Sequence, residues 1–239
     1  MIHPAAKVGF ARSADAYERA RPEYPAEAVE HLVSQVPAGA RVLDLAAGTG
    51  KLTRPLLASG LEVVAVDPVD EMRAALPIPG LAGTAEEIPV ADRSVDAVTV
   101  GQAFHWFDGE RALAEIHRVL RPRGLLALLW NRRLEGDPVN RRISELLAPY
   151  RGEVPTHRYD SWRAAFAETS LFGPLEERAF ANEQVLDADG MAERSGSISF
   201  IAALEEPERS KVLEAARAIA GGGTAVVPYR CEVQMCRAR

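Results

Sequence analysis

The residues best suited to chemistry stand where a short apolar run meets a glycine-containing turn. Residues 41–45 (RVLDL) fit a buried strand, residues 46–50 (AAGTG) a tight turn, and residues 51–59 a helix. In that arrangement the backbone N–H groups of the turn point toward whatever binds there, and glycine lets a ligand approach without meeting a Cβ atom. The pattern predicts a ligand site at the turn, with Asp44 and Asp67 as its carboxylates.

Three classes of ligand use such a turn, and the residues fit them unequally. A phosphate-binding P-loop requires glycine five positions before Gly50 and Ser or Thr after Lys51, but leucine stands at both positions. The dinucleotide pattern G-x-G-x-x-G matches at Gly48 and Gly50 and has threonine at its third position. An NAD(P)-dependent oxidoreductase stays an alternative because Asp67 could bind a ribose, although no Tyr-Lys pair follows the fourth predicted strand. S-adenosylmethionine has no pyrophosphate and requires no third glycine.

The elements around this turn alternate between strand and helix. Further apolar runs predict strands at residues 61–68, 80–84, 94–102 and 124–130. Helices are expected between them, at residues 69–76 and 108–122, the latter with Asp108 as N-cap and ending at Pro122. Alternation of this kind predicts right-handed βαβ units in an α/β fold. Residues 10–36 are predicted to be helical with a break at the prolines of RPEYP (21–25), and residues 173–184 and 224–235 to be strands.

Four motifs in this order resemble the class I S-adenosylmethionine-dependent methyltransferases, of the methyltransferase type 11 kind. They are VLDLAAGTG (42–50), VVAVDP (63–68), TAEEIPVADRSVDAVTVGQAFHWF (84–107) and EIHRVLRPRGLLALLWN (115–131). The segment FARSADAYERARPEYP (10–25) and the tripeptide HWF (105–107) resemble a subgroup that includes trans-aconitate-type carboxyl methyltransferases.

The resemblance implies a Rossmann-like fold with helices on both faces of a mostly parallel seven-stranded sheet and an antiparallel C-terminal strand. Residues 1–239 are then expected to form a single methyltransferase domain. Its parts would be a helical N-terminal cover (1–36), a cofactor-binding core (37–135), and a segment that supplies a substrate lid and completes the sheet (136–239).

The resemblance also implies which residues hold the methionine part of the cofactor. These lie in or beside the glycine turn, or just after the fourth strand: Asp44, Ala46, Ala47, Gly48, Gly50 and Gln102. Tyr17, with Arg12 or Arg21, is expected to close over the cofactor and its carboxylate. Each has a structural alternative: Asp44 could bond local amides, the arginines could be solvated, and Tyr17 could pack in the core.

The nucleoside part is expected to lie beside the second and third strands. Asp67 would accept both ribose hydroxyls, because a carboxylate has two oxygens. Pro68 and Val69 would contact the adenine, and Ala85 would donate its N–H to that ring, with Glu86 nearby. Thr84 is also expected near the adenine, but many members of the family have Asp at this position to hold the adenine amino group, so this chain departs from the family pattern there.

Methyl transfer in this family is a direct displacement by an oxygen, carbon or nitrogen nucleophile of the acceptor. A carboxylate acceptor needs no general base, because it is already deprotonated. If a base is needed, His105 is the best candidate, because it follows the fourth strand at the edge where open α/β sheets bind ligands. A structural role for His105 is the alternative. Further residues expected in the substrate pocket are Trp106, Trp130 and Asn131. Lid residues are expected in 137–204, with apolar candidates Trp162, Phe166 and Phe200.

Composition limits the remaining possibilities. A net charge of −6 disfavours a nucleic-acid substrate, and no apolar window reaches the length of a membrane span. Cys231 and Cys236 are five apart, so in a strand they face opposite sides as reduced structural thiols. No metal-like spacing is found. We expect a cytoplasmic monomer or homodimer acting on a small molecule. A non-catalytic nucleoside-binding relative remains an alternative.

Overall fold

One mixed sheet organises the computed structural model, which describes residues 18, 20–152 and 161–239. Its strands follow the order β3-β2-β1-β4-β5-β7-β6. In chain order they are β1 (Arg41–Leu45), β2 (Glu62–Val66), β3 (Gly80–Leu81), β4 (Val95–Gly101), β5 (Leu120–Arg133), β6 (Glu176–Leu186) and β7 (Ala225–Arg237). The first five are parallel, and β7 runs antiparallel to both β5 and β6. The predicted fold class, including the antiparallel C-terminal strand, is confirmed.

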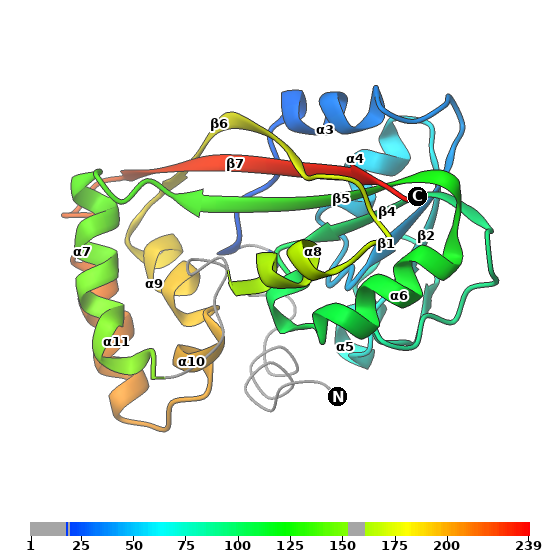
Figure 1. Cartoon of the computed structure of the whole chain (residues 1–239). Coiled ribbons are helices and arrows are strands. Elements are labelled where there is room, and N and C mark those ends of the chain that lie inside the picture. The colour runs from blue at the N-terminus through cyan, green and yellow to red at the C-terminus, as the bar shows by residue number, and fades with distance from the viewer. Residues whose placement is uncertain (1–17, 19, 153–160) are drawn as a thin grey trace.

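Helices cover both faces of the sheet (Figure 1). On one side lie α3 (Ala26–Val33) and α4 (Thr53–Ala58). On the other side lie α5 (Asp70–Ala74), α6 (Gly109–Val119) and α8 (Ala164–Glu168). Apolar residues of β5 alternate between the two resulting cores: Leu125, Ala127 and Leu129 belong to one, and Leu126 and Leu128 to the other. This alternation is the period-two pattern of a strand buried on both faces.

The two cysteines of β7 follow the same alternation. Cys231 lies in the core under α3 and α4, and Cys236 lies in the core under α6. Both are buried free thiols, as predicted.

Helix α6 ends earlier than its sequence predicts. Asp108 caps it, accepting the N–H of Arg111 at 3.3 Å. The helix stops at Val119, not at Pro122, because Leu120 already pairs with Val95 as the first residue of β5. The pairing register then shifts between Val95 and Ala97, and the extra residues form the bend that brings β5 alongside β4.

A separate helical layer lies beyond the carboxyl ends of the parallel strands (Figure 1). It consists of α7 (Pro138–Leu147), α9 (Ala188–Gly196), α10 (Ser199–Ala202) and α11 (Glu208–Arg217). These helices share an apolar core with the adjoining ends of β6 and β7, where Leu186, Val227 and Tyr229 are buried. Short 3-10 turns complete the description: η1 (Phe104–Trp106), η2 (Ala148–Tyr150) and η4 (Ser161–Arg163). Among the helices described, none combines the length and the apolar character needed to cross a bilayer.

Candidate functional site

A cavity of about 180 Å³ lies between the carboxyl ends of β1, β4 and β5 and the helical layer. Its floor is the turn after β1, and its outer wall includes Leu147, Ile198 and Phe200. Seven residues predicted for the cofactor or substrate line it: Arg21, Asp44, Ala46, Ala47, Gly48, Gln102 and Asn131. The carboxyl edge of a parallel sheet is where this class of fold binds ligands.

The two glycines of the turn have different roles. Gly48 has a φ of +57°, and a Cβ placed there would meet no heavy atom within 4 Å, so its Cα faces open space. Gly50 has a φ of +90°, but its Cβ would lie 2.7 Å from Cδ of Pro77. Gly48 therefore leaves room for a ligand, whereas Gly50 is required for packing and does not line the cavity.

Two non-glycine residues that line the cavity adopt left-handed backbone conformations. Ala46 follows β1 with a φ of 56°, and Gln102 follows β4 with a φ of 59°. Hydrogen bonds hold both turns, from Ala47 N–H to the Val66 carbonyl (3.1 Å) and from Gln102 N–H to the Leu129 carbonyl (2.9 Å). Strained backbone of this kind concentrates at functional sites, and here it occurs at the ends of two neighbouring strands.

Asp44 is a buried carboxylate at the floor of the cavity. It accepts hydrogen bonds from Thr53 (2.6 Å) and Thr99 (3.1 Å). Burial raises its pKa to about 6 against the opposing effect of these hydroxyls, and nearby Asp67 adds to the rise. A cationic ligand group would restore the charged form of Asp44.

Asp67 joins the end of β2 to the glycine turn. One carboxylate oxygen accepts the N–H of Gly48 and the other accepts the N–H of Val69, both at 2.9 Å. Burial raises the pKa of Asp67, although these two backbone hydrogen bonds oppose the rise. Each oxygen keeps acceptor capacity for a further donor. Asp67 itself does not line the cavity.

The residues predicted for the adenine lie away from the cavity walls. Val69 and Ala85 are buried, while Pro68 and Glu86 are half-buried. The Glu86 carboxylate accepts the N–H of Asp108 at 3.1 Å, which ties this segment to the start of α6.

The aromatic residues predicted for the substrate pocket form a cluster of their own. The centroid of the His105 ring lies 4.8 Å from the ring centroid of Trp106 and 5.6 Å from that of Trp130. Trp130 is buried and donates its indole N–H to Gln234 at 2.9 Å. None of the three lines the cavity. Burial, with a smaller effect of Arg21, lowers the pKa of His105 to about 4.

Other predicted residues divide between cavity and core. Asn131 lines the cavity and is fixed by two bonds: its side chain donates to the Glu23 carbonyl (3.1 Å) and accepts from Asn182 (2.9 Å). Of the apolar lid candidates, Phe200 lines the cavity, whereas Trp162 and Phe166 pack around Phe104 in the core. Tyr17 and Arg12 lie outside the described residues.

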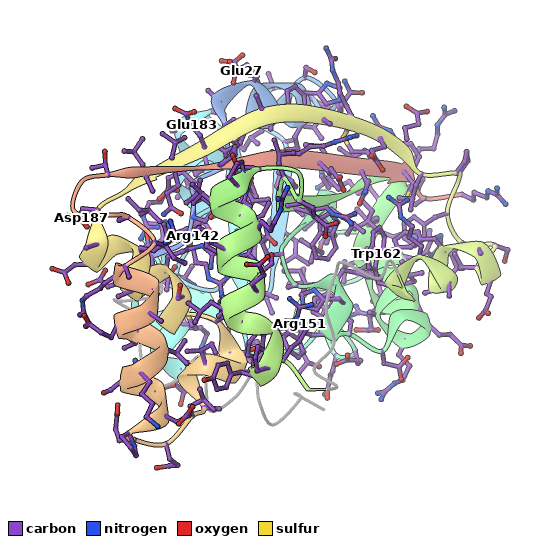
Figure 2. All side chains as sticks on the ribbon, turned by 90° about the vertical axis from the view of Figure 1, so that its left-hand side faces the viewer. Glu27, Arg142, Arg151, Trp162, Glu183 and Asp187 are labelled. Atoms are coloured by element: carbon purple, nitrogen blue, oxygen red, sulfur yellow. The ribbon has the colours of Figure 1, made fainter. Side chains whose placement is uncertain are left out.

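The sequence analysis missed most of the positive charge in the cavity. Besides Arg21, the lining contains Lys51, Arg133, Arg151 and Arg194, and Asp44 is the one carboxylate among the lining residues. Arg133 had a detectable signal, because it follows Asn131 by two positions in a strand and so faces the same side. Arg194 lies in α9 and Arg151 directly follows η2, and neither belongs to a motif. Figure 2 labels Arg151 at the end of the helical segment that continues α7. Within the described ranges, no group of three His, Cys, Asp or Glu residues could hold a metal.

Comparison with known proteins identifies relatives of this chain. A family model described as a methyltransferase domain matches residues 43–128. An uncharacterized methyltransferase-like protein of Schizosaccharomyces pombe is 38% identical over 204 residues, which are 82% of this chain and 79% of that protein. An uncharacterized methyltransferase of Mycobacterium tuberculosis is 52% identical over 158 residues, 57% of this chain, and the chain spans only 64% of its length.

A solved structure from Anaeromyxobacter dehalogenans, assigned as a type II methyltransferase, shares the fold. It superposes with a TM-score of 0.64 at 26% identity, covering 91% of this chain and 97% of that one.

Proposed function

Because the chain belongs to the class I S-adenosylmethionine-dependent methyltransferases, we propose that it transfers a methyl group from S-adenosylmethionine to a small-molecule acceptor by direct displacement. S-adenosylhomocysteine is the second product. The observation that carries the proposal is the open space above Gly48, flanked by the buried carboxylates of Asp44 and Asp67.

The residues at this turn fit the chemical groups of the cofactor. Asp67 has acceptor capacity left on both oxygens, which suits the two ribose hydroxyls. Asp44 is buried, lines the cavity and suits the positively charged amino group. Gly48 allows close approach to the backbone. The guanidinium of Arg21, which lines the cavity and donates to the Ser197 carbonyl at 2.8 Å, suits the carboxylate of the methionine part.

When bound, S-adenosylmethionine supplies a methyl group activated by a positively charged sulfur. The chain has to orient the acceptor and to exclude water. The strained turns at Ala46 and Gln102 form a rigid floor, and Ile198 and Phe200 form an apolar wall that excludes water. These residues provide positioning rather than acid–base chemistry.

The surroundings of His105 favour an acceptor that is already deprotonated. A group with a pKa near 4 is a weak base at neutral pH, and His105 does not line the cavity. No other histidine lines it among the described residues. An acceptor atom that is ionised near neutral pH, such as a carboxylate oxygen, requires no proton transfer to the protein.

Equilibrium binding tests the proposal. We expect isothermal titration calorimetry to show binding of S-adenosylhomocysteine and S-adenosylmethionine and none of NADH or NADPH. Nicotinamide cofactor binding without S-adenosylmethionine binding would overturn the proposal. Tight S-adenosylhomocysteine binding with no turnover of any acceptor in a broad panel would favour the non-catalytic relative.

A further inference from the structure

Arg194, which lines the side of the cavity nearest the helical layer, has no carboxylate partner among the residues that the structure describes. Arg194, on α9, is only 8% exposed and lines the cavity. Its Nη1 atom is buried and has no hydrogen-bond partner among the described residues. No described carboxylate lies within ion-pair distance of Arg194. A buried cation without a partner is unfavourable and is normally paired or hydrogen-bonded.

The protein nevertheless fixes this arginine in place. Its Nε–H donates to the Tyr229 hydroxyl at 3.1 Å, and that hydroxyl donates to Gln184 at 3.2 Å. Gln184 in turn donates to the Ala20 carbonyl at 3.0 Å. Tyr229 is 2% exposed, so the chain of hydrogen bonds is built into the core of the helical layer. One edge of the guanidinium is thus held by the protein, while Nη1 is left for another acceptor.

The other cations of the cavity differ in how far they are neutralised. Lys51 pairs with Glu23 and lies 3.9 Å from Glu18. Arg151 is half-buried, and its side chain forms no ion pair or hydrogen bond with any described residue. Arg194 and Arg151 therefore create a positive potential on the side of the cavity nearest the helical layer, and a cleft lined by one sign of charge concentrates ligands of the opposite sign.

The one carboxylate of the cofactor is assigned to Arg21, so the cofactor leaves Arg194 without a negatively charged partner. S-adenosylmethionine carries a sulfonium and an ammonium group against a single carboxylate, so its binding adds one net positive charge to the cavity. We propose that the methyl acceptor is an oxyanion, a carboxylate-bearing or phosphate-bearing small molecule, and that Arg194, supported by Arg151, binds its anionic group. This inference rests on the proposed function, because it assigns the substrate class of the same site.

The test measures anion binding to the full chain saturated with S-adenosylhomocysteine, at constant ionic strength. Succinate and inorganic phosphate are the probes, and succinamide is the neutral match for succinate. We expect succinate or phosphate to bind and succinamide not to bind. We expect Arg194→Met to weaken anion binding at least tenfold, with the affinity for S-adenosylhomocysteine unchanged within twofold. Arg194→Lys should lose less affinity for the anions than Arg194→Met, because lysine keeps the positive charge.

Arg217→Met is the matched control, since this arginine is exposed on α11, pairs with Asp189 and does not line the cavity. Arg217→Met should bind both anions as wild type does. If Arg194→Met does not fold, as judged by lost binding of S-adenosylhomocysteine and lost cooperative unfolding, Arg151→Met decides, with an expected loss of about threefold or more.

The outcomes separate the two proposals. Equal binding of succinate and succinamide, with no binding of phosphate, would overturn the inference. Weaker S-adenosylhomocysteine binding with unchanged anion binding in Arg194→Met would place Arg194 in the cofactor site and also overturn it. A wild-type chain that binds no S-adenosylhomocysteine overturns the proposed function, and with it the assignment of a methyl acceptor. Anion binding to the cofactor-free chain then still decides whether Arg194 holds an anionic group.

Discussion

The carboxylate of Asp67 accepts the backbone N–H of Gly48 at 2.9 Å, which connects two strand ends that are nineteen residues apart in the chain. The glycine turn after β1 and the acid after β2 are therefore one unit. The bond also fixes the orientation of the N–H groups in the turn, because Gly48 has a positive φ and no side chain to hold it. Loss of either partner should disturb the same ligand.

Asp67→Ala is expected to weaken S-adenosylhomocysteine binding by about 1–3 kcal/mol, since it removes the proposed ribose contacts and leaves the Gly48 N–H without its partner. Calorimetric titration measures the change. Asp67→Asn keeps one acceptor oxygen and should lose less affinity for S-adenosylhomocysteine than Asp67→Ala. An unchanged affinity in Asp67→Ala would remove this residue from the site.

Gly48→Ala should reduce cofactor affinity more than it reduces stability. Its left-handed backbone costs a residue with a Cβ about 1–2 kcal/mol, and the new methyl group would occupy the proposed cofactor space. Gly60→Ala is the matched control, because Gly60 has a φ of +77° and also has no atom within 4 Å of an added Cβ, but lies outside the cavity. Both variants should lose similar stability by chemical denaturation, and only Gly48→Ala should lose S-adenosylhomocysteine binding. Equal affinities in the two variants would contradict the assignment of Gly48.

Much of the fold follows from patterns that the sequence displays directly. The strand before the glycine turn (RVLDL) and the strand after it (EVVAV) are mostly apolar, and β7 is rich in β-branched residues, so period and composition were sufficient to predict them. The end of α6 was mispredicted because Leu120 pairs with Val95 in a long-range contact, which ends the helix before the local stop signal at Pro122. Helix-termination signals are read from neighbouring residues in the chain, so they do not show that a residue will pair with a distant strand instead of continuing the helix.

The sequence predicted the side of the cavity formed by strand ends better than the side formed by the helical layer. Asp44, Gly48 and Gln102 follow strand ends, and strand ends of a parallel sheet meet at one edge. Arg194 lies in α9 and Arg151 directly follows η2. The positions of these segments depend on packing against β6 and β7, and no local pattern encodes that packing. Trp130 was assigned to the pocket because it ends an apolar strand. Its side chain instead lies in the core and donates a hydrogen bond to Gln234.

Removing the charge of Asp44 should raise the stability of the fold and weaken cofactor binding. Its folded pKa of about 6 lies above the ordinary value of 3.8. The stabilisation from protonated Asp44 is therefore fully present below about pH 4 and is lost as the pH rises through 6, which corresponds to about 3 kcal/mol. Asp44→Asn should raise the free energy of unfolding relative to wild type more at pH 8 than at pH 5, and should weaken S-adenosylhomocysteine binding. Urea denaturation at both pH values measures the first effect; equal differences at the two pH values would contradict the buried charge.

The two thiols should be inert while the chain is folded. Burial raises the pKa of Cys231 and of Cys236 to about 12, and only the thiolate reacts with disulfide reagents. At about pH 8 we expect no reaction of the native protein with an aromatic disulfide, and complete reaction of both thiols in concentrated guanidinium chloride. Rapid modification of either cysteine in the folded chain would show that its part of β7 opens.

His105 should remain neutral throughout the physiological range. Its pKa of about 4 lies below the ordinary value of 6.5, because burial disfavours the imidazolium form and Arg21 adds repulsion. Ring resonances assigned to His105 by NMR should not titrate between about pH 5.5 and 8. A pH–rate profile should then show no inflection from His105 in that interval, and an inflection near pH 6 that comes from Asp44 should persist in His105→Phe. If an inflection instead disappears in His105→Phe while S-adenosylhomocysteine binding is unchanged, His105 is the general base that its position after β4 first indicated, and the acceptor is then a group that must lose a proton.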